Sequence, residues 1–572
     1  MARRQSQEAF DLGAVGAGGP QRAGRPAGVW GLLRRLSHRT KVLLLAAGSL
    51  ALFALLLCAN SLRDSSTVPP PPMQPVPDAQ VPDVQRPDVQ VPDKPAEDHK
   101  ETVAAKCSEL PIPAGYWSME AAPAFVEIPQ AGDIGVGASV CVRVVVPAKE
   151  LGISRSFAPF PDTPWDSILL DLVGAETGIS VPAELQMANN TQNYRRDAAH
   201  VYQADVVLHD ADRFKPEGYI EFRGARWNGE DHLETQVLEP EPLAVAPDVA
   251  VRVTDRLGND QFGIGRYLQL PLCTVADADG RWVAADKLPF DAELAPAPDN
   301  YNRVWLPYTC RLQRYTYQAF SRCLAQHYPL VHWFGDSNTR RAMKKITTFG
   351  RWCSTPADMA TDLCRCSDNA EAFGGIDLNA PVVPIDLNQT ADAGPAPRIT
   401  LFRWGGLTTR NDPPWEDTFK QPGGLAAKWG APQTVIIGLI NWDVAFSTRA
   451  FFVSEAEKLA EHVAASYGDS TDIVLRTGQY YCCSYDTSTV YRRKFSRLRV
   501  QYFNRYLVDA FRRRLGAKRR IFVWDVALPF ERRPFAARDD EAKQCAPNHA
   551  RAEIIELENQ LLFNAMCNQP FD

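Results

Sequence analysis

The sequence predicts an α/β domain built on a parallel sheet, preceded by an all-β sandwich. Two observations carry this prediction. Residues 107–299 consist of short β-rich segments separated by turns, with no strong helix signal between them. Residues 300–572 alternate strand-like and helix-like segments, which is typical of a parallel sheet covered by helices. The residues before 107 differ from both parts and divide into a tail, an apolar segment and a proline-rich stem.

The composition limits the classes of function. A chain of 572 residues with 45% hydrophobic content is long enough for more than one domain with its own core. The formal net charge of -6 offers no broad basic face, so we expect no nucleic-acid partner. The cysteine spacing matches neither a zinc ribbon nor a haem attachment site, so we expect no metal and no cofactor.

An apolar segment at residues 42–62 predicts a membrane anchor. It contains no charged residue and is long enough to span a bilayer as a helix. A cleaved signal peptide is the alternative, but the segment is longer than a usual signal core and begins far from the N-terminus. Residues 1–41, predicted to be a disordered tail, are basic near the segment, so the positive-inside rule keeps them cytoplasmic. The sequence therefore predicts a single-pass type II membrane protein with a lumenal or extracellular C-terminal part.

The chain beyond the anchor has the composition of a protein from an oxidising compartment. Residues 63–106 carry a Val-Pro-Asp repeat that favours an extended, semi-rigid stem. Of the 13 cysteines, Cys58 lies in the anchor and all others follow it, an even number that permits complete disulfide pairing. Asn189 and Asn388 each begin an acceptor triplet for an N-glycan.

The strand signals fall into two groups. In the β-rich part they predict an immunoglobulin-like sandwich over residues 107–299, with strands at 139–146, 202–208, 218–222 and 249–253. In the α/β part we expect strands at 330–334, 399–404, 434–440, 472–477 and 520–524. Helices are expected between or after them, at 338–349, 450–466, 491–515 and 550–566. Ligands of such folds bind where the parallel strands end.

The tripeptide Gly335-Asp336-Ser337 lies where the first of these α/β strands ends. An apolar run stops at the glycine and passes into a helix-permissive basic stretch, which predicts a strand, a tight turn and a helix. Ser337 would then lie at a helix N-terminus, where backbone amides can stabilise the oxyanion formed when a serine attacks an ester. The alternative is that these residues only cap the helix, because Asp and Ser are ordinary capping residues.

A serine nucleophile needs a base, and His549 is the best candidate. It follows Cys545-Ala546-Pro547-Asn548 and directly precedes the last predicted helix. His332 alternates within the strand of the motif and is expected in the sheet, whereas His462 falls within a helix. Taken alone, His549 could also be an ordinary residue of a loop before a helix.

These motifs together resemble the SGNH hydrolase superfamily. The segments are Phe334-Gly335-Asp336-Ser337-Asn338-Thr339-Arg340, Gly438-Leu439-Ile440-Asn441-Trp442-Asp443, and the histidine before the closing helix. More narrowly they are similar to the PC-esterase branch, which includes the trichome-birefringence-like and the neurexophilin and PC-esterase-like proteins. The resemblance covers residues 300–572. It implies a three-layer α/β/α fold, a type II anchor, and a role in adding or removing O-acetyl groups on glycans.

The resemblance also implies roles for individual residues. Ser337 would be the nucleophile, His549 its base, and the backbone amide of Ser337 one oxyanion donor. Asn441 would supply a side-chain donor, and Gly405 or Gly406, after the strand that ends at Trp404, a backbone donor.

The chain departs from the family pattern three residues before His549. Ala546 stands where the family has an aspartate that orients the histidine. Asp525, just after a predicted strand, could supply a carboxylate instead; Asp539 and Asp540 are weaker alternatives, and a Ser-His dyad needs none.

The sequence therefore leads to one main hypothesis and two rivals. The main hypothesis is a membrane-anchored protein of the secretory pathway, expected in the Golgi. It would be a serine O-acyltransferase or esterase that acts on O-acetyl groups of a glycan through an acyl-enzyme. The first rival is a catalytically inactive glycan-binding or adhesion protein, which Ala546 favours. The second, a glycosyltransferase, fits the anchor and stem, but the α/β part lacks a convincing Asp-x-Asp metal motif.

Overall fold

The computed structural model of the chain describes two folded parts. The expected tail and anchor, the expected stem up to residue 104, the glycan triplets at Asn189 and Asn388, and Ala546 lie outside the described residues. Within the described part, no helix has the length and apolar character needed to cross a membrane. The described residues are 105–120, 122–130, 133–149, 164–188, 199–224, 241–255, 261–354, 375–387, 395–408, 414–420, 422, 424–480, 496–533 and 549–568.

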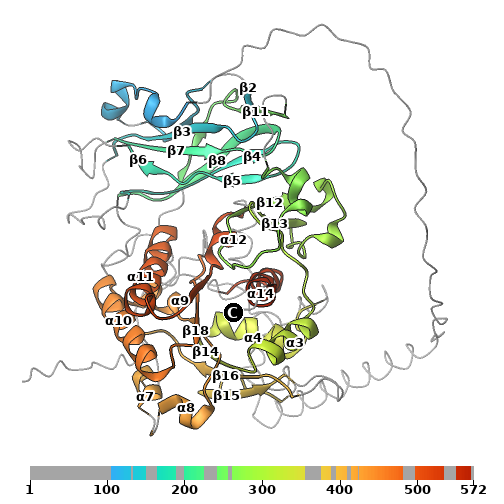
Figure 1. Cartoon of the computed structure of the whole chain (residues 1–572). Helices are drawn as coiled ribbons and strands as arrows, with labels where there is room; N and C mark the ends of the chain where they lie inside the picture. The colour runs from blue at the N-terminus through green and yellow to red at the C-terminus, as the bar shows by residue number, and fades with distance from the viewer. Residues whose placement is uncertain are drawn as a thin grey trace, which may run out of the picture. The chain divides into compact units, whose positions relative to one another are not determined.

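The N-terminal part consists of two β-sheets that pack face to face (Figure 1). One sheet has the strand order β10-β1-β3-β7-β6 and the other β13-β12-β5-β4-β8-β11-β2, with β9 paired to β8. Alternate apolar residues of β3 and β4, among them Val142, Val144, Leu170 and Leu172, fill the core between the sheets. The strands are β1 Phe125–Glu127, β2 Asp133–Gly135, β3 Ser139–Val146, β4 Ser167–Gly174, β5 Ser180–Pro182, β6 Gln186–Met187, β7 His200–Val207, β8 Asp212–Phe222, β9 Glu241–Pro242, β10 Ala244–Val245, β11 Val251–Thr254, β12 Gly280–Ala284 and β13 Arg303–Pro307.

The C-terminal part is an α/β structure, as the sequence predicts. Its sheet has the order β15-β16-β14-β17-β18-β19, in which β15 is antiparallel to its neighbour and the other pairs are parallel. The edge strand β15 was not expected from the sequence. The strands are β14 Leu330–Gly335, β15 Val382–Asp386, β16 Arg398–Arg403, β17 Thr434–Gly438, β18 Asp472–Arg476 and β19 Ile521–Trp524.

Helices cover both faces of this sheet (Figure 1). On one face α3, α4 and α14 pack together, and on the other α7, α8, α10 and α11 do so. The helices are α3 Tyr317–His327, α4 Ser337–Thr347, α7 Trp415–Phe419, α8 Gly424–Trp429, α9 Ile440–Phe446, α10 Arg449–Ser466, α11 Arg497–Leu515, α12 Ala527–Glu531 and α14 Ala552–Cys567.

Residues 96–572 form one compact unit, in which the β-rich and α/β parts make buried contacts. The indole N–H of Trp282 on β12 donates to the backbone carbonyl of Pro529 on α12 at 2.6 Å. The boundary expected between residues 299 and 300 separates β12 from β13, yet these strands pair along their whole length. The structure therefore extends the β-rich part to Pro307, because β13 completes its larger sheet.

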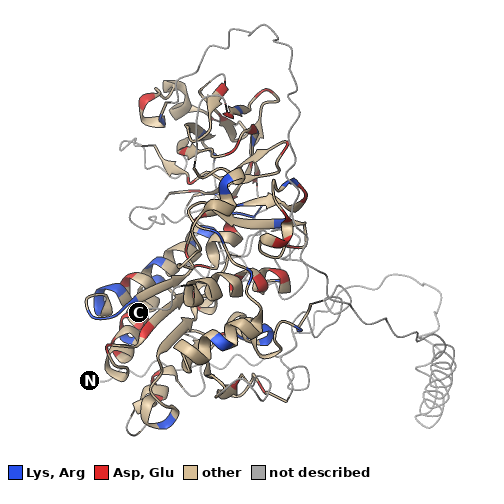
Figure 2. Cartoon of the chain, turned by 45° about the vertical axis from the view of Figure 1, so that its right-hand side comes forward, with Lys and Arg blue, Asp and Glu red and all other residues tan. Residues whose placement is uncertain are grey.

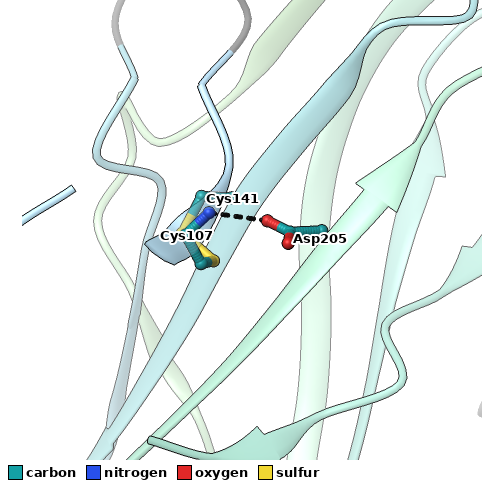
Figure 3. A group of neighbouring side chains, drawn as sticks. All are labelled: Cys107, Cys141 and Asp205. Carbon is teal, nitrogen blue, oxygen red and sulfur yellow. Dashed lines mark hydrogen bonds between the residues drawn. A yellow bond between two sulfur atoms is a disulfide. The ribbon is translucent and has the colours of Figure 1, made fainter. Parts of the chain in front are cut away.

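Disulfides between described residues confirm the expected oxidised cysteines. They join Cys107 to Cys141, Cys273 to Cys310, and Cys323 to Cys567. Figure 3 shows the first, beside which the backbone N–H of Cys107 donates to the Asp205 carboxylate at 2.7 Å. The sulfur atoms of Cys107 and Cys141 are bonded to each other, so this group of two cysteines and an aspartate is not a metal site. The disulfide links the chain before β1 to strand β3.

Basic and acidic residues are interspersed over the described chain (Figure 2). Near the end of α11, Arg513 and Arg514 form ion pairs with Glu457 and Glu461 of α10. These exposed basic residues are thus partly neutralised by the neighbouring helix.

Candidate active site

The strand, turn and helix at Gly335-Asp336-Ser337 depend on two paired glycines. Gly335 ends β14 and lies opposite Gly438, the last residue of β17. A Cβ atom on Gly335 would overlap the side chain of Thr339 in α4, and one on Gly438 would lie 2.9 Å from the Thr339 hydroxyl. That hydroxyl donates to the Gly438 carbonyl at 3.1 Å. The glycines therefore allow α4 to begin close against the strand ends.

Asp336, and not Ser337, caps helix α4. Its carboxylate accepts hydrogen bonds from the backbone N–H groups of Asn338 at 2.9 Å and Thr339 at 3.2 Å. Burial raises the pKa of Asp336, and the nearby Arg476 guanidinium opposes this shift. Ser337 is the first residue of α4 and stays partly exposed, whereas Asp336, Asn338 and Thr339 are buried. The capping alternative thus applies to Asp336 and leaves the Ser337 hydroxyl available for chemistry.

His549 lies beside Ser337. Its Nε2 atom is 2.7 Å from the Ser337 Oγ atom, although the two residues are 212 positions apart in the sequence. His549 is partly exposed, as Ser337 is. A neutral imidazole with its proton on Nδ1 can accept the serine proton at Nε2, as a general base does.

Helix α14, which follows His549, is anchored to the strand ends by a buried network. Glu558 on α14 forms an ion pair of 2.7 Å with Arg476 at the end of β18, and both side chains are at most 1% exposed. The other Glu558 carboxylate oxygen accepts from the Gln479 side chain. The Trp524 indole at the end of β19 donates to the Glu558 carbonyl at 2.8 Å. Two strand ends therefore fix the helix that follows His549.

Asn441 lies at the carboxyl end of the neighbouring strand, in the first turn of α9. Its side-chain amide donates to the Gln479 carbonyl at 2.9 Å, and its Oδ1 atom accepts from the Gln479 backbone N–H at 3.2 Å. An asparagine amide has two N–H groups, and the bond to Gln479 uses one of them. A role for the second as an oxyanion donor stays a prediction.

Asp443 of α9 forms hydrogen bonds to the loop that follows Gly405 and Gly406. This buried carboxylate accepts from the backbone N–H groups of Leu407, at 2.9 Å, and of Thr408, at 2.8 Å. A Cβ atom on Gly406 would lie 2.9 Å from it. Burial raises the pKa of Asp443 to about 7, and the Thr408 and Leu407 bonds limit the shift. The oxyanion role of the two glycines stays a prediction, but their loop is held next to the Asn441 helix.

Asp525 has structural partners. Its carboxylate accepts from the Thr477 hydroxyl at 2.9 Å and from the backbone N–H groups of Ala527 and Leu528, each at 3.1 Å. These bonds hold it at the start of α12, where burial raises its pKa. A role for Asp525 behind His549 stays a prediction. Asp539 and Asp540 lie outside the described residues.

The order of the strands supports a site at this edge of the sheet. Along the chain, β16 adds to one side of β14, and β17, β18 and β19 add to the other. The topological switch point therefore lies between β14 and β17, the strands that precede Ser337 and Asn441. Open α/β sheets bind ligands in the crevice outside this point.

The sequence reasoning missed Asp443, Glu558, Arg476 and Gln479. Asp443 lies two residues after Asn441 in the same motif, which was a usable signal. Glu558 interrupts a largely apolar helix, and an acid at such a position often has a buried partner.

Comparison with known proteins adds no assignment. No family model and no curated protein matches the chain. One solved structure aligns with 41% of this chain and 94% of its own length, at 15% identity and a TM-score of 0.23. A likeness at this level carries no argument about fold or function, so the candidate active site stands on its own geometry.

Proposed function

We propose that this chain is a serine acyltransferase or esterase that forms an acyl-enzyme on Ser337. The observation that carries the proposal is the distance of 2.7 Å between His549 Nε2 and Ser337 Oγ at the switch point of the sheet. The partial exposure of both residues adds support, because a substrate must reach the hydroxyl.

In the proposed reaction His549 takes the hydroxyl proton while Ser337 Oγ attacks the acyl carbonyl carbon. The oxyanion that forms is stabilised by the Ser337 backbone N–H at the start of α4, and by donors expected from Asn441 and the Gly405–Gly406 loop. When the intermediate collapses, the bond to the leaving alcohol breaks and His549 returns the proton to that alcohol. The acyl group then passes from Ser337 to a second hydroxyl or to water by the same steps in reverse.

The substrate, the compartment and the finer fold belong to the same proposal. The resemblance to the PC-esterase branch supports O-acetyl groups on a glycan as the substrate and the Golgi as the compartment. It also supports an SGNH-like α/β/α domain, with the β-rich part as its immunoglobulin-like companion. The apolar segment at 42–62 supports attachment to the membrane by one helix.

A fluorophosphonate probe tests the proposed nucleophile directly. With the folded full-length protein we expect one covalent adduct, located on Ser337 by peptide mass spectrometry. The Ser337→Ala variant should give no adduct. Ser118→Ala, which changes an exposed serine in the β-rich part, should react like wild type. A folded wild-type protein that is not modified at Ser337 would overturn the proposal.

The inactive glycan-binding protein remains a second candidate because Ala546 replaces the family's aspartate. It makes the opposite prediction in cells. If the chain only binds glycans, Ser337→Ala will leave its cellular function unchanged, whereas loss of function supports the acyl-enzyme.

A further inference from the structure

The segment Gly478–Tyr480 connects the candidate active site to the rest of the molecule. It follows β18, and its middle residue is bonded through both backbone groups to the Asn441 side chain, at 2.9 and 3.2 Å. The Gln479 side chain donates to Glu558 on α14. A shift of this segment would therefore move Asn441 and the helix that follows His549 together.

The β-rich part holds the last residue of this segment. The Tyr480 hydroxyl donates to Glu221 Oε1 at 2.9 Å, and Tyr480 is fully buried. Glu221 lies near the end of β8 and is itself buried. Its other oxygen accepts from the Ser167 hydroxyl of β4 at 2.7 Å and from the backbone N–H of Arg497, the first residue of α11, at 3.2 Å.

Glu221 is thus fixed from three directions, and its carboxylate geometry is set by the fold. The hydroxyl of Ser167 comes from its own sheet, and the Arg497 N–H and the Tyr480 hydroxyl come from the α/β part. Only the Tyr480 hydroxyl connects this carboxylate to the segment that holds Asn441, and losing that bond would leave a buried polar group without this partner.

We propose that Glu221 is a positioning residue of the Ser337 site. Through Tyr480 and Gln479 it fixes the amide of Asn441 at the strand end next to Ser337, so the β-rich part is a component of the active site. The inference rests on the proposed function, because Asn441 matters for the rate only if an oxyanion forms at Ser337.

Two variants separate this role from simple stabilisation. Tyr480→Phe and Ser167→Ala each remove one hydrogen bond to Glu221, but only the first removes a bond to the segment that holds Asn441. With the fluorophosphonate probe and the full-length protein, we expect Tyr480→Phe to lower the maximal rate of Ser337 modification about fivefold to tenfold. The probe concentration at half-maximal rate should not change. The modification rate of Ser167→Ala should stay within about twofold of the wild-type rate. The two variants should have similar midpoints of urea unfolding.

Equal rates for the two variants, whether both lowered or both unchanged, would overturn the positioning role. If wild type itself is not modified at Ser337, the proposed function fails, and hydrogen exchange still decides the structural link. Tyr480→Phe should then speed amide exchange in peptides covering 438–446 and 477–480 more than Ser167→Ala does. Equal exchange in the two variants would reject Glu221 as a positioning residue even without activity.

Discussion

His549 is the residue on which the proposed chemistry depends most after the nucleophile. Removing its side chain deletes the acceptor of the Ser337 proton and leaves α4 and its N-terminus intact. We expect His549→Ala to lower the rate of Ser337 modification by about 10²- to 10⁴-fold, the usual contribution of a general base. His327→Ala, at the end of α3, should react like wild type. Similar rates in the two variants would contradict the role of His549.

Asn441 combines two roles whose effects differ in size. As a clamp it holds Gln479, and as the expected oxyanion donor it acts on the transition state. Losing one oxyanion donor typically lowers the rate by about 10²- to 10³-fold. We therefore expect Asn441→Ala to reduce the maximal modification rate by that amount, far more than Tyr480→Phe. A reduction no larger than that of Tyr480→Phe would leave Asn441 only the clamping role.

Some residues of the site could be predicted from the sequence because a local signal marks them. Ser337 follows a glycine that ends an apolar run, and His549 precedes the final helix. Asp443 and Glu558 could not be assigned roles, because a buried acid depends on the groups that meet it in the folded chain. The amides of the loop after β16 and the guanidinium of Arg476 come from distant parts of the sequence.

At the scale of elements, the crossing of α4 over the end of β14 depends on the absence of a side chain at Gly335. A methyl group there would overlap the Thr339 side chain, which is buried and cannot move away. We expect Gly335→Ala to lower the free energy of unfolding by about 2–3 kcal/mol. At Gly265 an added Cβ atom would meet open space, so Gly265→Ala should change the free energy of unfolding by less than about 1 kcal/mol. Urea unfolding measures both, and equal losses would show that the contact is not tight.

The elements themselves could largely be predicted, because apolar runs and turn residues mark buried parallel strands. The structure confirms the expected strands near 330, 399, 434, 472 and 520. Two edge strands were not predicted correctly from the sequence. Strand β15 contains a proline and alternates buried and exposed residues, and β13 belongs to the β-rich part although it lies beyond the expected boundary. Such strands form because they pair with a strand that is distant in the sequence or lies across the expected domain boundary. A local sequence pattern contains no information about this pairing.

At the scale of the whole molecule, buried acids lie where the β-rich and α/β parts meet. Arg497 forms ion pairs with the exposed Glu184, at 2.7 Å, and with the buried Glu531, at 3.3 Å, and its backbone N–H donates to the buried Glu221. Burial raises the pKa of Glu221 to about 7, opposed by the bonds from Ser167, Tyr480 and Arg497. Burial also raises the pKa of Glu531 to about 7. The nearby Glu184 adds to this shift, and the nearby Arg497 opposes it. The stability of the contact between the two parts is therefore expected to depend on pH.

This sensitivity predicts that the protein is more stable in mild acid than at neutral pH. In the unfolded chain these glutamates lose their protons near the ordinary pKa of 4.5, whereas in the folded chain they keep them up to about pH 7. The folded state then binds more protons over this window, so the free energy of unfolding falls as the pH rises through it. Urea unfolding between about pH 5 and about pH 8 measures the slope. Glu221→Gln should flatten it, because glutamine stays neutral, while Glu217→Gln, an exposed position on the same strand, should not. A wild-type free energy that rises with pH over this window would contradict the buried, proton-binding contact.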